Sequence, residues 1–254
     1  MDKVHVIGRI FPSTIRLSIR SPVLPLTSAT TGLQAGFRVS IQDWIVNVEC
    51  HIEKFELKHL NDILNGALDY ARTLINLIGF ATGIGVSVVF EYAILPDGEI
   101  APIMLQTPAL ASLCTAYGLE PERYEDLLAV IQMVIADRNL YKSFNDLIDT
   151  QITPHISLIN GARVIESIRW MIAPNVKREA PAWAAMHKAL NLSEAYLKWI
   201  TEQSKGPRHG DPSQVSASAQ LEATERAWKI MNRYLEYRNR GSQPLAEPEF
   251  PELN

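Results

Sequence analysis

The spacing of hydrophobic residues changes near Gly118, and this change constrains the fold more than any other feature. Before it, apolar and polar residues alternate in short stretches, the pattern of half-buried β-strands. After it, apolar residues recur every three or four positions, as in amphipathic helices. We therefore predict an α+β protein with a β-rich N-terminal half containing one long amphipathic helix, followed by an all-α antiparallel helical bundle. The predicted domains are residues 1–118 and 119–240, with a proline-rich tail at 241–254.

Alternating patterns predict three strands in the N-terminal half, at residues 15–20, 44–53 and 86–94. In the third, Val86, Val88, Phe90, Tyr92 and Ile94 are expected to share one face. Residues 96–99, Pro-Asp-Gly-Glu, are typical of a turn, because proline presets φ and glycine tolerates a positive φ. A returning strand at 100–105 would complete a hairpin.

A long amphipathic helix is predicted at residues 57–78, between the second and third strands, where it would cover one face of the sheet. The uncharged stretch 74–90 overlaps its end and is the only candidate for a membrane span. Glycines at 79, 83 and 85 interrupt that stretch and its periodicity changes halfway. We interpret it as a helix that ends in a glycine turn and is followed by a buried strand, and we predict no membrane association.

Helices are predicted in the C-terminal half at 121–135, 158–172, 183–190, from Ser193 onward, and 217–240. Ser193 has the residue type of an N-cap. The buried stripe of the last helix is expected to contain Leu221, Trp228, Met231 and Leu235. The tail from 241 contains three prolines and no periodicity, so it is expected to be either an extended strap or a disordered end.

The composition excludes several classes of protein. The formal net charge is −4, so a dedicated duplex-DNA binder is not expected, and any contact with nucleic acid would use a local basic patch. The two cysteines, Cys50 and Cys114, lie far apart in apolar surroundings. We interpret them as reduced and structural, which favours the cytoplasm, and no metal or cofactor is expected.

No phosphate-binding loop, dinucleotide fingerprint, nucleophile elbow or zinc-protease motif is present in the sequence. Five of the six histidines have no second ligand or catalytic partner at a convincing spacing, and we interpret them as ordinary structural or surface residues. They are His5 and His51, which are placed in strands, with His59, His155 and His187. An enzyme that uses a metal or cofactor in the sheet domain is the weakest hypothesis, because no ligand cluster supports it.

The sixth histidine belongs to a short basic segment at residues 204–211, Ser-Lys-Gly-Pro-Arg-His-Gly-Asp. Its glycines and prolines are expected to hold this connection out of a helix and to project Lys205, Arg208 and His209 from a turn. Arginine matches the geometry of a phosphate, and histidine transfers protons near neutral pH, so these residues could bind and cleave RNA. Alternatively, the cations only face the carbonyl groups at a helix end, and Asp211 pairs with Arg208.

Residues 151–240 resemble the HEPN superfamily of helical domains, most closely at 204–211 and in the helix 221–240. The resemblance implies a homodimer formed through the bundle and a metal-independent endoribonuclease. In it, Arg208 would bind phosphate and stabilise the transition state, His209 would be the general acid/base, and Lys205 would assist in binding phosphate. Arg208 and His209 are adjacent here, whereas the family signature places several residues between them.

The alternative function is a non-catalytic ligand-binding or regulatory module that uses the bundle as a dimer interface. RNA or a nucleotide is the expected partner if the basic segment binds phosphate. A further observation would strengthen such a site. If Arg163, Glu166 or Arg169 of the second predicted helix faces Arg208, the four residues would form a shared polar pocket.

Overall fold

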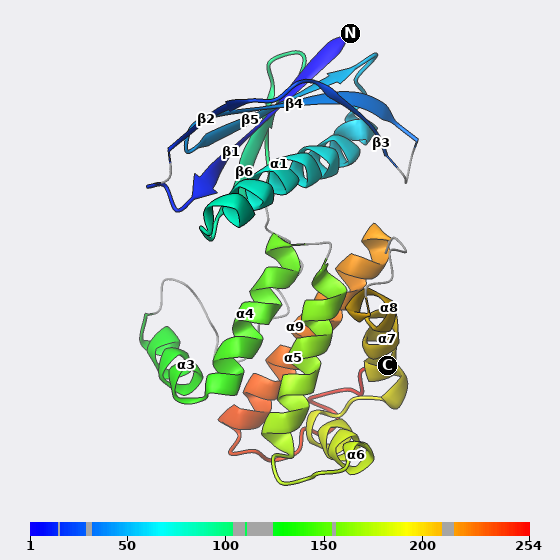
Figure 1. Cartoon of the computed structure of the whole chain (residues 1–254). Helices are drawn as coiled ribbons and strands as arrows, with labels where there is room; N and C mark the ends of the chain where they lie inside the picture. The colour runs from blue at the N-terminus through cyan, green and yellow to red at the C-terminus, as the bar shows by residue number, and fades with distance from the viewer. Residues whose placement is uncertain (15, 29–31, 104–109, 111–123, 154–155, 210–215) are drawn as a thin grey trace. The chain divides into compact units, whose positions relative to one another are not determined.

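The computed structural model describes the chain apart from residues 15, 29–31, 104–109, 111–123, 154–155 and 210–215. It divides into two compact units, residues 1–104 and 105–254 (Figure 1). The first is a sheet with one long helix, and the second is helical, so the predicted α+β class is confirmed. The predicted domain boundary at residue 118 lies outside the described residues.

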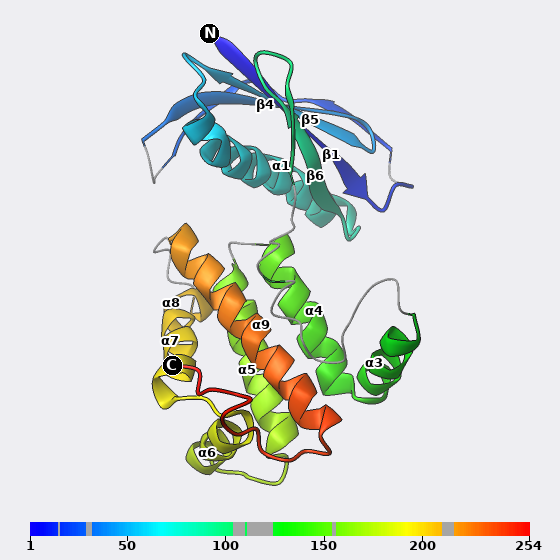
Figure 2. The ribbon, with the colours of Figure 1, turned by 180° about the vertical axis from the view of Figure 1, so that it is seen from behind.

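The described strands of the N-terminal unit form one antiparallel sheet in the order β2-β4-β5-β1-β6-β7, with β3 also paired to β4 (Figure 2). Their bounds are β1 Asp2–Phe11, β2 Leu17–Arg20, β3 Leu24–Thr27, β4 Gln34–Asp43, β5 Ile45–Ile52, β6 Ser87–Ile94 and β7 Ile100–Pro102. The predicted strands correspond to β2, β5 and β6. The turn at 96–99 joins β6 to β7, with Gly98 at φ 89°, as its sequence indicates. The sequence analysis gave no bounds for β1, β3 and β4.

The predicted face of β6 is wrong beyond Phe90. Gly8 of β1 pairs with Phe90, whereas the preceding Ile7 pairs with Tyr92, so Glu91 is an extra residue in β6. Such a β-bulge reverses the alternation of side chains that follow it. Val88 and Phe90 are buried as expected, but the buried residues after the bulge are Ala93 and Leu95.

The long predicted helix is present as α1, Leu60–Thr82, preceded by a short 3-10 turn at Leu57–His59. Its buried residues recur every four positions and pack on the sheet: Ile63, Ala67, Ala71, Ile75 and Gly79. Gly83 ends the helix in the left-handed conformation, with φ 69°, and β6 follows. This confirms the interpretation of the uncharged stretch as helix, turn and strand. Among the described helices, none combines the length and apolar character needed to cross a bilayer.

The helical unit is arranged around α5, which contacts α4, α6, α7, α8 and α9 (Figure 1). The described helices are α3 Tyr124–Ala136, α4 Arg138–Ile152, α5 Ser157–Ile172, α6 Glu179–Leu190, α7 Glu194–Gln203, α8 Lys205–Arg208 and α9 Ala217–Asn239. Trp228, Met231 and Leu235 of α9 belong to the core as predicted. Leu221 does not, because its side chain is exposed.

Helix α4 was not predicted, although its apolar residues Leu140, Phe144, Leu147 and Ile148 recur at helical spacing. Its buried positions are Leu140, Ser143, Leu147 and Thr150, so two of the four are hydroxyl residues. The buried hydroxyl groups are satisfied within the helix, because Ser143 donates to the Asn139 carbonyl and Thr150 to the Leu147 carbonyl.

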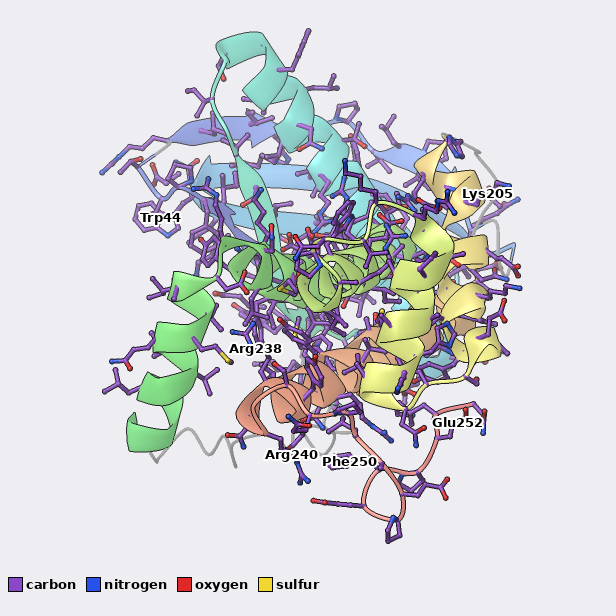
Figure 3. All side chains as sticks on the ribbon, turned by 90° about the horizontal axis from the view of Figure 1, so that it is seen from below. Trp44, Lys205, Arg238, Arg240, Phe250 and Glu252 are labelled. Carbon is purple, nitrogen blue, oxygen red and sulfur yellow. The ribbon has the colours of Figure 1, made fainter. Side chains whose placement is uncertain are left out.

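The C-terminal tail is a strap, one of the two predicted alternatives. The Leu245 amide donates to the Ala189 carbonyl, and the Leu253 amide donates to the Asn191 carbonyl. Arg240 and Arg233 each place a guanidinium group over the Phe250 ring, at 4.6 and 5.3 Å from its centroid (Figure 3). The strap therefore holds the connection between α6 and α7 in place.

Candidate functional site

The basic segment does not stay out of a helix as predicted, because Lys205–Arg208 forms the helical turn α8. The Arg208 amide donates to the Ser204 carbonyl at 3.0 Å, and the His209 amide donates to the Gly206 carbonyl at 2.9 Å. Pro207 is compatible with this turn because residues in a first helical turn need no amide hydrogen bond. The expectation that its glycine and proline exclude helix is therefore wrong for Lys205–Arg208.

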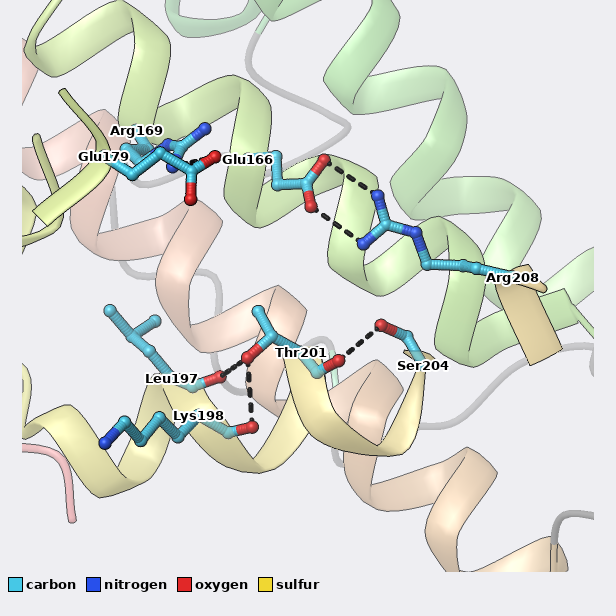
Figure 4. Close-up of polar contacts among 8 residues, drawn as sticks. All are labelled: Glu166, Arg169, Glu179, Leu197, Lys198, Thr201, Ser204 and Arg208. Carbon is cyan, nitrogen blue, oxygen red and sulfur yellow. Dashed lines mark hydrogen bonds and ion pairs between the residues drawn. The ribbon is translucent and has the colours of Figure 1, made fainter. Parts of the chain in front are cut away.

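Within this segment, Arg208 is held by Glu166 of α5. The Arg208 Nη1 atom donates to Glu166 Oε1 at 2.8 Å, and Nη2 donates to Oε2 at 3.2 Å, a bidentate pair (Figure 4). Lys205 and His209 are exposed. Asp211, the alternative partner of Arg208, lies outside the described residues. The roles predicted for Lys205, Arg208 and His209 stay predictions.

Arg208 stands at the edge of a groove of about 1020 Å³ between α5, α6, α7 and α8. Lys205 and His209 are not among the residues that line it. The groove combines acidic and basic side chains with apolar surface, which is the larger part of its lining. Its lining residues are Glu166, Arg169, Glu179, Ala180, Trp183, Ala184, His187, Lys188, Glu194, Leu197, Lys198, Thr201, Glu202 and Arg208.

Of the three α5 residues considered as partners of Arg208, only Glu166 contacts it directly, and Arg169, three residues later, lines the same groove. Residues three apart on a helix share a face, which explains why both reach it. The third, Arg163, is not a lining residue and instead has a 3.4 Å contact from its Nη1 to the Asn160 side chain.

Arg169 is the most unusual of the lining residues, because its charged side chain is only 9% exposed. The guanidinium carbon lies 4.6 Å from the centre of the Trp183 ring and 5.8 Å from that of Trp170. Its nearest carboxylate oxygen belongs to Glu179, at 3.7 Å, which is beyond hydrogen-bond distance, and the Glu179 side chain is 82% exposed. Within the described part of the chain, no hydrogen bond reaches the Arg169 guanidinium.

His187 contributes an imidazole to the groove, a role that the sequence analysis did not assign. Its Nδ1 lies 3.0 Å from the Leu192 carbonyl oxygen, which can only accept, so Nδ1 must carry a proton. In the neutral ring, Nε2 is then the acceptor. Trp183 and His187 are four residues apart and lie on one face of α6. That spacing was the one sequence signal that could have linked them.

Helix α7 forms another wall, and the hydroxyl groups of Ser193, Thr201 and Ser204 are engaged within the helix. Ser193 caps the helix as predicted, because its Oγ accepts from the Tyr196 amide. Thr201 Oγ1 donates to the carbonyls of Leu197 and Lys198, and Ser204 Oγ donates to the Thr201 carbonyl (Figure 4). Lys198 pairs with Glu194 at 2.6 Å. Charged groups, rather than hydroxyls, are thus the groups that this wall offers to a ligand.

Two family matches place this groove within a defined domain. Residues 4–104 match the family described as "Domain of unknown function (DUF8168) N-terminal domain", and residues 127–239 match the corresponding C-terminal domain. The two matches occur in the order that their names give and together cover most of the chain. The chain belongs to the DUF8168 family. All lining residues, from Glu166 to Arg208, fall within the DUF8168 C-terminal domain.

The searches of curated proteins and of solved structures found no match to this DUF8168 protein. In the described residues, no three side chains of histidine, cysteine, aspartate or glutamate are grouped so that they could hold a metal ion.

Proposed function

We propose that the DUF8168 C-terminal domain is a ligand-binding module that holds an oxyanion in the groove between α5, α6 and α7. The observation that carries this proposal is the buried guanidinium of Arg169, which faces the groove without a hydrogen-bonded acceptor among the described residues. Arg169 is ion-paired with Glu179 at 3.7 Å, and its nitrogens are not among the buried polar atoms that lack a partner. A carboxylate or phosphate oxygen in the groove would replace water on the guanidinium and add a charge-assisted hydrogen bond.

The surroundings of Arg169 suit recognition better than structural support. The Arg169 guanidinium carbon lies over the Trp183 ring, 4.6 Å from its centre, a cation–π contact that restrains the side chain. Glu179 is exposed and too distant to form a hydrogen bond with that guanidinium. An arginine held in this way is preorganised, so little side-chain entropy is lost when a ligand binds.

The geometry favours binding over catalysis through the predicted residues. Both terminal nitrogens of Arg208 are engaged by Glu166, and His209 does not line the groove. A metal-independent ribonuclease needs its phosphate-binding group and its acid/base within reach of one phosphate. This favours the ligand-binding module, which is the alternative stated from the sequence.

The binding proposal is tested by calorimetric titration of the full chain with pyrophosphate and with citrate at constant ionic strength. We expect Arg169→Gln to weaken binding of an anion about tenfold or more, the effect of one charge-assisted hydrogen-bond pair. Arg138→Gln is the matched control, because Arg138 is an exposed arginine of α4 outside the groove. Failure of both anions to bind, or equal binding by wild type and Arg169→Gln, would overturn the proposal.

A metal-independent endoribonuclease of the HEPN type, acting as a homodimer through the helical unit, is the second candidate. The presence of Arg208 and the imidazole of His187 in one groove favours it, because the groove then combines a phosphate-binding group with an acid/base. Arg208 and His209 are the proposed catalytic residues, Lys205 and Arg208 the proposed phosphate contacts, and RNA the proposed substrate. The buried free thiol of Cys50 supports a cytoplasmic location for either function.

The ribonuclease is tested by incubating the wild-type chain with mixed RNA in EDTA, beside His209→Ala and His187→Ala. Loss of cleavage only in His209→Ala would support His209 as the general acid/base. Loss of cleavage only in His187→Ala would instead assign that role to His187 in the groove. Intact RNA in every lane would leave the binding module as the function.

A further inference from the structure

We propose that the oxyanion bound by the groove is a phosphate, and that Glu166 excludes simple carboxylates by occupying the guanidinium of Arg208. This inference rests on the proposed binding function and deepens it, since it names the chemical class of the ligand and the residue that selects it.

Glu166 lies between the two arginines of the groove. It is three residues before Arg169 on α5, and its carboxylate makes the bidentate pair with Arg208 of α8 (Figure 4). Glu166 therefore occupies the position on Arg208 that a ligand oxyanion would take. Arg169, by contrast, has no such bidentate partner among the described residues.

The Glu166–Arg208 pair can exchange with a ligand. The two side chains are 33% and 35% exposed, so water reaches both partners. Exposed ion pairs contribute little to stability, because water and salt compete with each partner. Opening this pair is therefore inexpensive.

A carboxylate ligand gains little from such an exchange. Glu166 presents the same chemical group, and its attachment to α5 gives it an effective concentration near Arg208 of about millimolar. A free carboxylate must exceed that concentration to replace it. A phosphate carries roughly −1.5 to −2 charges at neutral pH and three acceptor oxygens. It can satisfy Arg208 with two oxygens and keep a third for another contact in the groove.

The remaining charged groups of the groove balance one another. Lys188 of α6 and Lys198 of α7 line it together with Glu179, Glu194 and Glu202. Lys198 is paired with Glu194 of the same helix, and Arg208 is likewise paired with Glu166. The lining of the empty groove is therefore close to neutral. It becomes cationic only where an anion displaces a carboxylate of the protein, such as Glu166, from its basic partner.

Calorimetric titration of the full chain at fixed ionic strength tests the proposal with five probes: inorganic phosphate, pyrophosphate, adenosine monophosphate, acetate and succinate. In wild type we expect the phosphates to bind and the carboxylates to bind at least about tenfold more weakly. Glu166→Gln should bind the phosphates about fivefold more tightly and gain binding of succinate, because its competitor is removed. Arg208→Gln should weaken phosphate binding.

Glu202→Gln is the matched control, because Glu202 lines the groove on α7 and its removal changes the net charge by the same amount. An equal gain in Glu166→Gln and Glu202→Gln would reduce the effect to general electrostatics and overturn the role of Glu166. Succinate binding as tight as pyrophosphate in wild type would overturn the phosphate assignment. In both cases the proposed function stands if Arg169→Gln still weakens binding, and it falls if Arg169→Gln has no effect. Tighter binding of adenosine monophosphate than of inorganic phosphate would identify a phosphate ester as the source, and the reverse would identify free phosphate.

Discussion

Asp137 links the start of α4 to the last turn of α9 through Arg238. Its Oδ2 accepts from Arg238 Nη1 at 3.2 Å, while its Oδ1 accepts from the amides of Asn139 and Leu140 at 3.1 and 3.2 Å. One carboxylate thus caps a helix and pairs with a residue 101 positions later in the chain. We expect Asp137→Ala to lower the free energy of unfolding by about 1–2 kcal/mol, the usual cost of losing an N-cap, measured by thermal denaturation.

Asp137→Asn separates the two roles, because asparagine caps helices almost as well but carries no charge for Arg238. It should cost less than half as much as Asp137→Ala. Equal losses in the two variants would mean that the ion pair, and not the cap, stabilises this junction.

Gly66 allows α1 to approach the sheet at Phe37. A Cβ atom added to Gly66 would lie 2.8 Å from Phe37 Cζ, and the Phe37 ring is buried. Alanine favours helix over glycine by about 1 kcal/mol, but overpacking a core costs about 1–3 kcal/mol. We therefore expect Gly66→Ala to lower the melting temperature, although alanine is the better helix former. Asn65→Ala, at the exposed neighbouring position, should not lower it.

Glu49 makes the stability of the sheet unit dependent on acidic pH. The hydrogen bond from Lys3, at 2.7 Å, keeps the pKa of Glu49 below its ordinary value of 4.5, and His51 and Arg38 act in the same direction against the effect of burial. A carboxyl group with a lowered pKa in the folded state stabilises the fold above its unfolded pKa. That contribution is lost as the pH falls through the folded value.

Stability should therefore decrease below about pH 4.5. In Glu49→Gln, we expect lower stability at pH 7 and a smaller further loss on acidification, measured by urea denaturation across the pH range. Glu53→Gln, an exposed control on the same strand end, should retain the wild-type pH profile. An identical profile in Glu49→Gln would remove Glu49 as the cause.

Cys50 should be inert to thiol reagents while the protein is folded. Its thiol is fully buried in the core between the sheet and α1, and burial raises its pKa to about 12. The thiolate is the reactive form, so both access and ionisation are suppressed. In a Cys114→Ser background, we expect no reaction with an aromatic disulfide reagent at pH 8 and release of one equivalent after denaturation. Rapid reaction of the native protein would contradict the burial of Cys50.

The sequence predicted the elements best where one physical cause determined their pattern. The long helix α1 and the glycine turn that ends it were predictable because Ile63, Ala67, Ala71 and Ile75 recur at helical spacing and Gly83 tolerates a positive φ. The N-cap at Ser193 was predictable because it depends only on neighbouring amides. Helix α4 was missed although Asp137 is a typical N-cap and Leu140, Phe144 and Leu147 recur at helical spacing.

The face of β6 shows where local pattern stops being informative. Val88 and Phe90 alternate as expected, but the extra residue Glu91 is tolerated only because Gly8 of β1 lies opposite Phe90. A Cβ at Gly8 would approach Phe90 Cδ1 to 2.6 Å, so the bulge depends on a glycine about 80 residues earlier in the chain. Nothing within β6 itself indicates that its later residues change sides.

The sequence by itself determined the α+β class, the long helix, the boundaries of most helices and the presence of a basic segment at 204–211. These properties follow from the periodicity and residue types of short stretches. Only the tertiary structure decided the groove, because Glu166, Arg169, Trp183, His187 and Arg208 come from two separate helices and the α8 turn. The tertiary structure also decided that Arg208 is paired with Glu166 and that Arg169 is largely buried. Burial and pairing depend on which helices pack together, and the local spacing of residues carries no information about that packing.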